Sequence, residues 1–163
     1  MSEKILSEIL PTDSKYKRAG KITINAPAEV IFDLVADPRN HALFDGSDTL
    51  RGNVRGPDRL ELGSKFGMDM HIFANYRIKN TVVEFEENRR IAWCHPGHHR
   101  WRYELESIDP NTTVVVETFD GSTARIPAAL KLMNAYENNQ KAILKTLVRL
   151  KEVAEKKVAE SSS

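Results

Sequence analysis

Residues 22–38, ITINAPAEVIFDLVADP, change their hydrophobic period in the middle of the stretch. Ile22 and Ile24 alternate with polar residues, which is typical of a half-buried strand. Pro27 then ends the strand, because proline cannot donate to a β-ladder and suits the first turn of a helix. After it, apolar residues recur at helical spacing until Pro38. The stretch therefore predicts a strand, a tight turn and a short helix, in that order.

Outward from this stretch, most of the chain is strand-like until one long helical segment. Short alternating or β-branched runs between residues 49 and 119 are separated by turn sequences such as Pro96-Gly97. Such short connections predict an antiparallel sheet with one buried face. Residues 38–45 fit a second short helix. Residues 128–157 carry an apolar stripe flanked by charged side chains, which predicts one continuous amphipathic helix.

The two ends of the chain are expected to lie outside the domain. Residues 1–19 are predicted to be an appendage of a short helix and a loop, because a one-face apolar stripe ends at Pro11. A weakly ordered terminus is the open alternative. Residues 20–157 would then form the single folded domain, and residues 158–163 a disordered tail.

The composition limits the classes of partner. The chain has 163 residues, 40% of them hydrophobic and 29% charged, with a net charge of +1. This balance indicates one globular domain, and the low net charge argues against nucleic acid as a partner. No apolar run approaches the roughly 20 residues of a membrane span, which argues against integral membrane association. The single cysteine, Cys94, excludes an internal disulfide and a multi-cysteine metal site. We expect a cytoplasmic protein with no cofactor and no metal. A homodimer is compatible with these features, and the sequence does not decide the oligomeric state.

Several segments, taken in order, resemble the START-like or SRPBCC superfamily, in its polyketide cyclase/dehydrase and lipid-transport-like branch of actinobacterial type. They are ITINAPAEVIFDLVADP, GSKFGM, NTVVEFEENRRIAW, HRWRYELE, TVVVETFDGS and ILKTLVRLKEVAE. The resemblance covers residues 20–155. It implies an α+β helix-grip fold, in which a seven-stranded curved antiparallel sheet surrounds a long C-terminal helix, with two short helices after the first strand. It also implies a hydrophobic cavity, but no shared catalytic residue.

Apolar and aromatic residues at inward positions are the candidates for a cavity wall, because methionine and aromatic side chains suit adaptable pockets. Ordinary core packing is the alternative for each one. The candidates, with one polar residue of the long helix, are Phe66, Met68, Met70, Tyr76, Trp93, Trp101, Tyr103, Phe119, Met133, Tyr136 and Gln140.

Other polar residues have a functional and a plain interpretation. His95, His98 and His99 flank a hairpin turn, where a solvated tip is favoured over a metal site. Asp69 and His71 share one strand face and would form an acid–base pair only if that face lined the cavity. His41 and Phe44 fit either a cavity mouth or the packing of the small helices.

These observations favour a protein that binds a small hydrophobic ligand, lipid-like or polyketide-like, between the sheet and the C-terminal helix. One alternative is a polyketide aromatase/cyclase or dehydratase, so enzymatic activity stays undecided and no catalytic residue is assigned. A further alternative is a protein-interaction module whose cavity is filled by its own side chains.

Overall fold

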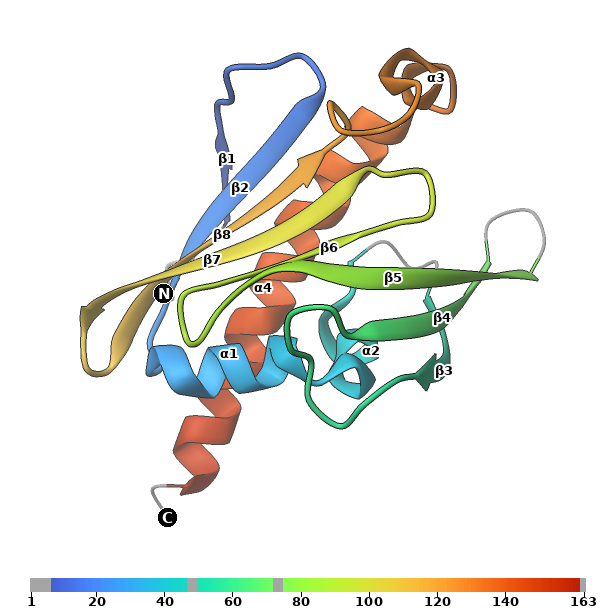
Figure 1. The fold of residues 1–163 in the computed structure, drawn as a ribbon. Helices are drawn as coiled ribbons and strands as arrows, with labels where there is room; N and C mark the ends of the chain where they lie inside the picture. Colours follow the sequence, from blue (N-terminus) through green and yellow to red (C-terminus); the bar gives the residue numbers. More distant parts are fainter. Residues whose placement is uncertain (1–6, 47–49, 72–74, 162–163) are drawn as a thin grey trace.

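The computed structural model describes residues 7–46, 50–71 and 75–161, without the side chains of residues 50–54, 68–71 and 75–77. Its strands form one antiparallel sheet in the order β1-β2-β8-β7-β6-β5-β4-β3, shown in Figure 1. The strands are β1 (Glu8–Leu10), β2 (Lys17–Ile24), β3 (Leu50–Arg55), β4 (Lys65–His71), β5 (Asn75–Glu86), β6 (Arg90–Cys94), β7 (Arg100–Asp109) and β8 (Thr112–Asp120). The helices are α1 (Ala28–Ala36), η1 (Pro38–Asn40), α2 (His41–Phe44), α3 (Pro127–Leu132) and α4 (Ala135–Ser161).

Helix α4 crosses one face of the sheet, where it packs on β2 and β8, and α1 and α2 also contact it (Figure 1). Its inward stripe of Ile143, Leu147, Leu150 and Ala154 is fully buried. The stripe meets the apolar residues of β2, including Ile22 and Ile24, in the single core cluster. The arrangement is the helix-grip fold that the family resemblance implied.

Polar contacts fix α4 to the main chain of β2 and of the residue after it. Gln140 donates from Nε2 to the carbonyl of Ala19 at 3.1 Å, and Lys151 donates from Nζ to the carbonyl of Thr23 at 3.2 Å. The amide of Asn25 donates to the Glu155 carboxylate at 2.8 Å. These contacts occupy main-chain groups near β1, which among the described residues pairs with residues 19–21 of β2.

Two glycines allow the close approach of α4. A Cβ on Gly20 of β2 would lie 2.9 Å from Ile143 Cγ2. A Cβ on Gly46, just after α2, would lie 2.6 Å from the Ala142 carbonyl oxygen. The Gly46 amide also donates to Thr146 Oγ1 at 2.8 Å, so the loop after α2 is held directly against the helix.

Both ends of the domain differ from the prediction. Residues 8–10 form an edge strand, β1, where a short helix was expected, so the sheet has eight strands. The pairing of β1 with β2 and a hydrogen bond from Ser7 Oγ to the Leu144 carbonyl, 2.7 Å, hold this segment to the domain. At the other end, α4 continues to Ser161, and Val158 packs against the core, so the predicted disordered tail is wrong for residues 158–161.

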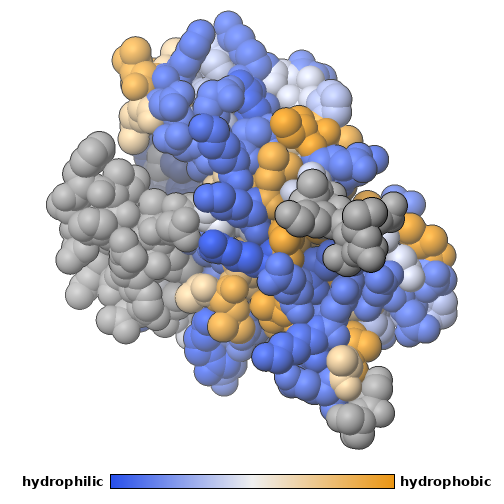
Figure 2. Space-filling model, turned by 180° about the vertical axis from the view of Figure 1, so that it is seen from behind, coloured by the Kyte–Doolittle hydropathy of each residue, from blue (hydrophilic) through white to orange (hydrophobic). Residues whose placement is uncertain are grey.

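The continuous helix predicted for residues 128–157 is interrupted once. Asn134 has a φ of 56°, a left-handed conformation that asparagine tolerates better than most residues. It separates α3 from α4 and turns Leu132 and Met133 outward, where they are 92% and 67% exposed. The placement of Met133 on the cavity wall is therefore wrong. Figure 2 shows apolar atoms at the molecular surface on the side of α4, including a patch in the region of α3.

Candidate functional site

The inner face of the sheet gathers most of the predicted aromatic residues. Phe66, Trp93, Tyr103 and Phe119 are between 1% and 6% exposed, and all belong to the core cluster. Trp93 lies 5.6 Å from Tyr103 and 5.4 Å from Phe66 between ring centroids. Trp101, half-buried, lies 5.0 Å from Phe119. The alternation of β6, β7 and β8 thus brings these rings from distant parts of the sequence to one side of the sheet.

A buried carboxyl group lies among these rings. Glu117 of β8 is 3% exposed and stands opposite Tyr103 of β7 in the strand register. Tyr103 lies beside the Glu117 carboxyl group across the two strands, and Oε1 of Glu117 has no hydrogen-bond partner. Burial raises the pKa of Glu117 well above its usual range. Burial, with Glu117 beside it, likewise raises the pKa of Tyr103.

Sequence reasoning missed Glu117. Glu117 shares its strand face with Val115 and Phe119, which are both fully buried. Because residues two apart on a strand point to the same side, this spacing could have predicted that Glu117 is buried. The signal is weak because Val114 and Val116, on the opposite face, are also apolar.

A second acidic residue acts on the same pair. Asp45 follows α2, and its charge raises the pKa of both Glu117 and Tyr103 after the larger effect of burial. The loop that carries Asp45 is held against α4 through Gly46, and Arg149 donates to the Asp45 main-chain carbonyl. The carboxyl groups of Asp45, after α2, and of Glu117, on β8, therefore both raise the pKa of the buried Tyr103.

Asn80 of β5 and the half-buried His95, just after β6, carry further buried polar atoms. Neither amide atom of the Asn80 side chain has a partner, and Asn80 is fully buried. Nε2 of His95 also lacks a partner. Thr81 of β5 pairs with Cys94 of β6. Asn80 precedes Thr81 and His95 follows Cys94, so in this antiparallel register the two residues lie opposite each other. The aromatic side of the sheet thus carries polar atoms that the protein itself leaves without hydrogen bonds.

The histidine hairpin is not the solvated tip that the sequence favoured. The rings of His95 and His99 stack at 4.4 Å, and His99 lies 5.6 Å from Phe119. Burial, and less strongly the neighbouring His99, lowers the pKa of His95 to about 3. His98 is exposed at the turn with a φ of 74°. Within the described residues, no three His, Cys, Asp or Glu side chains are grouped as metal ligands.

His41 serves packing rather than a cavity mouth. It is 4% exposed, its Nε2 donates to the Val35 carbonyl at 2.8 Å, and its ring stacks on Trp93 at 5.0 Å. Burial lowers the pKa of His41 despite this hydrogen bond. The neutral ring therefore joins the small helices to the aromatic side of the sheet.

Two of the predicted site residues on α4 use their polar atoms inside the protein. The Tyr136 hydroxyl donates to the Pro127 carbonyl at 2.8 Å, and its ring lies 5.8 Å from that of Phe119. Gln140 donates to β2, as described above. The side chains of Met68, Met70 and Tyr76, and those of Asp69 and His71, lie outside the described residues.

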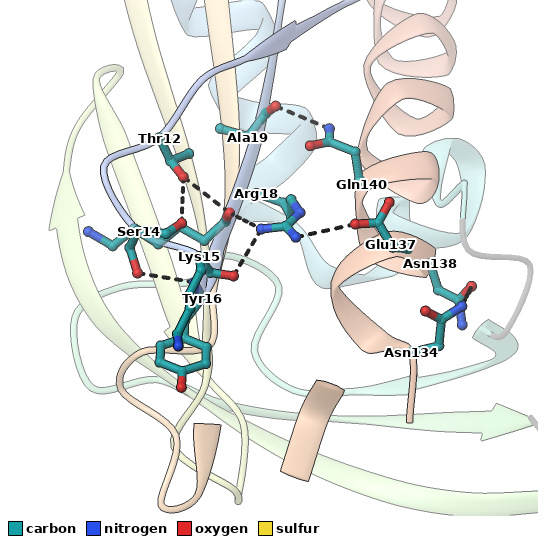
Figure 3. A network of polar contacts seen from close by, with 11 residues as sticks. Thr12, Ser14, Lys15, Tyr16, Arg18, Ala19, Asn134, Glu137, Asn138 and Gln140 are labelled. Atoms are coloured by element: carbon teal, nitrogen blue, oxygen red, sulfur yellow. Dashed lines mark hydrogen bonds and ion pairs between the residues drawn. The ribbon is translucent and has the colours of Figure 1, made fainter. Parts of the chain in front are cut away.

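An open depression of about 550 Å³ separates the β1–β2 connection from the start of α4. Its walls combine apolar residues of β1 with a polar network, in which Arg18 pairs with Glu137 at 3.2 Å and Thr12 Oγ1 donates to the main-chain carbonyls of Ser14 and Lys17 (Figure 3). Because Glu137 is largely exposed, this pair contributes under about 1 kcal/mol. We regard the network as the attachment of the N-terminal hairpin. Among the described residues, no helix is long and apolar enough to cross a membrane.

Comparison with known proteins gives relatives at two levels of similarity. An uncharacterised protein of Mycobacterium tuberculosis, Rv0088, is 47% identical over 100 residues, which are 61% of this chain and 45% of that protein. The match thus spans less than half the length of this curated relative. Among solved structures, protein NE0264 of Nitrosomonas europaea has a TM-score of 0.69 at 13% identity, over 91% of this chain and 99% of that one.

A structure with a printed activity is also similar. The Zhui aromatase/cyclase of a Streptomyces species aligns with a TM-score of 0.64 at 17% identity, over 87% of this chain and 94% of that one. At such identities the likeness shows the fold alone. A family model described as polyketide cyclase/dehydrase and lipid transport matches residues 17–155. These residues include every strand except β1 and most of α4. The chain therefore belongs to the polyketide cyclase/dehydrase and lipid-transport family.

Proposed function

We propose that the protein binds a small hydrophobic ligand, lipid-like or polyketide-like, between the inner face of the sheet and α4. Membership of the family supports this function, since the family description includes lipid transport. The similar aromatase/cyclase fold is consistent with a ligand of the same general kind. A cytoplasmic location remains a prediction.

The observation that carries the proposal is the set of buried polar atoms without partners. Asn80 is 0% exposed with both amide atoms unsatisfied, and Glu117 has one free carboxyl oxygen at 3% exposure. A buried polar group without a hydrogen bond costs about 1–3 kcal/mol. Such a cost is offset when a bound molecule supplies the missing partner. Aromatic rings on the same face offer the apolar contact that a hydrophobic ligand requires.

Two measurements test the proposal. Native mass spectrometry of protein purified without organic solvent should detect a bound hydrophobic compound. Titration with 2-acetonaphthone, a neutral aromatic ketone, should quench the fluorescence of Trp93 and Trp101, the two tryptophans of the chain, saturably at one molecule per chain. A protein without co-purified ligand that also gives no saturable quenching would refute the proposed function.

A pair of variants tests where the ligand binds. Val82, 1% exposed, faces Trp93 across β5 and β6, so Val82→Phe adds volume on the inner face. Thr81→Phe adds the same ring one residue earlier on the opposite face and is the matched control. We expect Val82→Phe to weaken binding at least about 10-fold and Thr81→Phe to leave it unchanged, with both folds checked by circular dichroism. Equal affinities for the two variants would place the ligand elsewhere.

A further inference from the structure

Glu117 lies in the interior of the sheet, with a neighbouring strand on each side. The register of β2, β8 and β7 sets Glu117 between Gly20 and Tyr103. Because Ile143 and Leu147 of α4 would contact a side chain at position 20, α4 covers this part of the sheet. Glu117 is therefore enclosed by strands on both sides and by an apolar helix above.

The surroundings of the Glu117 carboxyl group leave one of its oxygens without a hydrogen-bond partner. Tyr103 occupies one side of the carboxyl group, and Oε1 has no partner. A neutral carboxyl group can donate its O–H to a carbonyl oxygen or accept from a hydroxyl group. A ligand carbonyl or hydroxyl can thus complete the hydrogen bonding of this group without bringing charge into the interior.

A ligand carboxylate meets the opposite situation. The burial and the Asp45 charge that oppose ionisation of Glu117 would act on a second carboxylate in the same place. Two carboxyl groups in one buried site disfavour each other's ionisation, as paired acidic groups do generally. An ionised ligand must then take up a proton or remain outside.

We propose that Glu117 makes the interior selective for neutral ligands that carry a carbonyl or hydroxyl group, and that it discriminates against carboxylates. This inference rests on the proposed function and names the ligand class of the same site. It requires only that the ligand reach Oε1, the free atom of the buried carboxyl group.

Three naphthalenes of similar shape test the selectivity: 2-acetonaphthone, 2-naphthoate and 2-isopropenylnaphthalene. Affinities are measured at about pH 7 by calorimetry and tryptophan fluorescence. We expect the ketone to bind at least about 10-fold more tightly than the carboxylate, the factor that corresponds to a shift of one unit in the pKa of an acid. The hydrocarbon should lie between them. Equal binding of ketone and carboxylate, or tighter binding of the carboxylate, would overturn the inference and leave the proposed function standing. Failure of all three to bind to protein that also carries no co-purified ligand would overturn both.

Variants assign the selectivity to Glu117. Glu117→Gln keeps the shape and both hydrogen-bonding functions but removes the acid, so the ketone should bind within about 3-fold of wild type while the disadvantage of the carboxylate shrinks. Glu117→Leu should remove the preference for the ketone over the hydrocarbon. Glu106→Gln, on the exposed stretch of β7, is the matched control and should change neither ratio. An unchanged ketone-to-carboxylate ratio in folded Glu117→Gln would show that another group sets it.

Discussion

Lowering the pH from about 7 to about 5 should destabilise the protein through His95. The pKa of this side chain is about 3 in the folded protein, against 6.5 for an ordinary histidine, because the ring is buried against His99. Between these two values the unfolded chain binds a proton that the folded chain does not. Stability therefore falls as the pH decreases through this window. From the two pKa values, the loss attributable to His95 between pH 7 and pH 5 is ~2 kcal/mol.

The measurement is a double difference in the free energy of unfolding. Urea unfolding of wild type and His95→Asn at the two pH values isolates His95, because the effects of the other titrating groups cancel to first order. These include His41 and His99, whose pKa values burial also lowers, and Glu117, whose raised pKa acts in the opposite direction. With an m-value of about 2 kcal/mol per M, the expected difference is a relative midpoint shift of ~1 M.

A matched control removes a histidine of the same hairpin. His98 is exposed and has a left-handed backbone conformation that asparagine adopts readily, so His98→Asn is a mild change. Between pH 7 and pH 5, the free energy of unfolding of His98→Asn should change by the same amount as that of wild type, to within ~0.5 kcal/mol. If His95→Asn gave a double difference as small as this, the buried, neutral state assigned to His95 would be wrong.

Three further predictions concern stability. Gly46→Ala should lower the stability by about 1–3 kcal/mol, because the added Cβ would overlap the main chain of α4. Gly97→Ala should cost less, because its Cβ would meet only the His99 ring, at 3.3 Å. Thermal melting of both variants tests this difference. Ile143→Asp should destabilise the protein by at least ~3 kcal/mol, since it places a charge at a fully buried site, whereas Lys141→Asp at an exposed site should not. If Ile143→Asp kept the native near-ultraviolet circular dichroism and nearly the same melting temperature, the assignment of Ile143 to the buried face of α4 would be wrong. Arg18→Ala should cost under about 1 kcal/mol in urea unfolding, and a larger loss would show that the polar network of the N-terminal hairpin has more than a peripheral role.

The local elements could be predicted because their signals are local. In residues 22–38 the change from period 2 to helical spacing, with Pro27 between, marks the end of β2 and the start of α1 within a few residues. The break at Asn134 gives no such signal, since one residue in a left-handed conformation interrupts a helix without disturbing the apolar pattern on either side. The N-terminal stripe also fits a strand, and long-range pairing with β2 decides the matter.

The candidate site was predictable only in its apolar part. Burial of Trp93, Tyr103 and Phe119 follows from alternation, whatever their partners are. The pairing of Tyr103 with Glu117 depends on the register between β7 and β8, which no single segment specifies. Likewise, a polar hairpin such as the one around His95 suggests exposure to solvent unless the ring of a neighbouring element covers it.

The contacts between α4 and β2 also have a consequence for self-association. In the described part of the chain, the three-residue β1 is the only strand outside β2 at this edge of the sheet, so residues of β2 beyond this short partner would present free main-chain groups. Exposed groups of this kind recruit strands from other molecules and promote aggregation. Lys151 takes the Thr23 carbonyl and Glu155 takes the Asn25 amide, so the last helix of the chain blocks this margin of the sheet. Loss of these two side chains would therefore expose an adhesive strand before it disturbed the core.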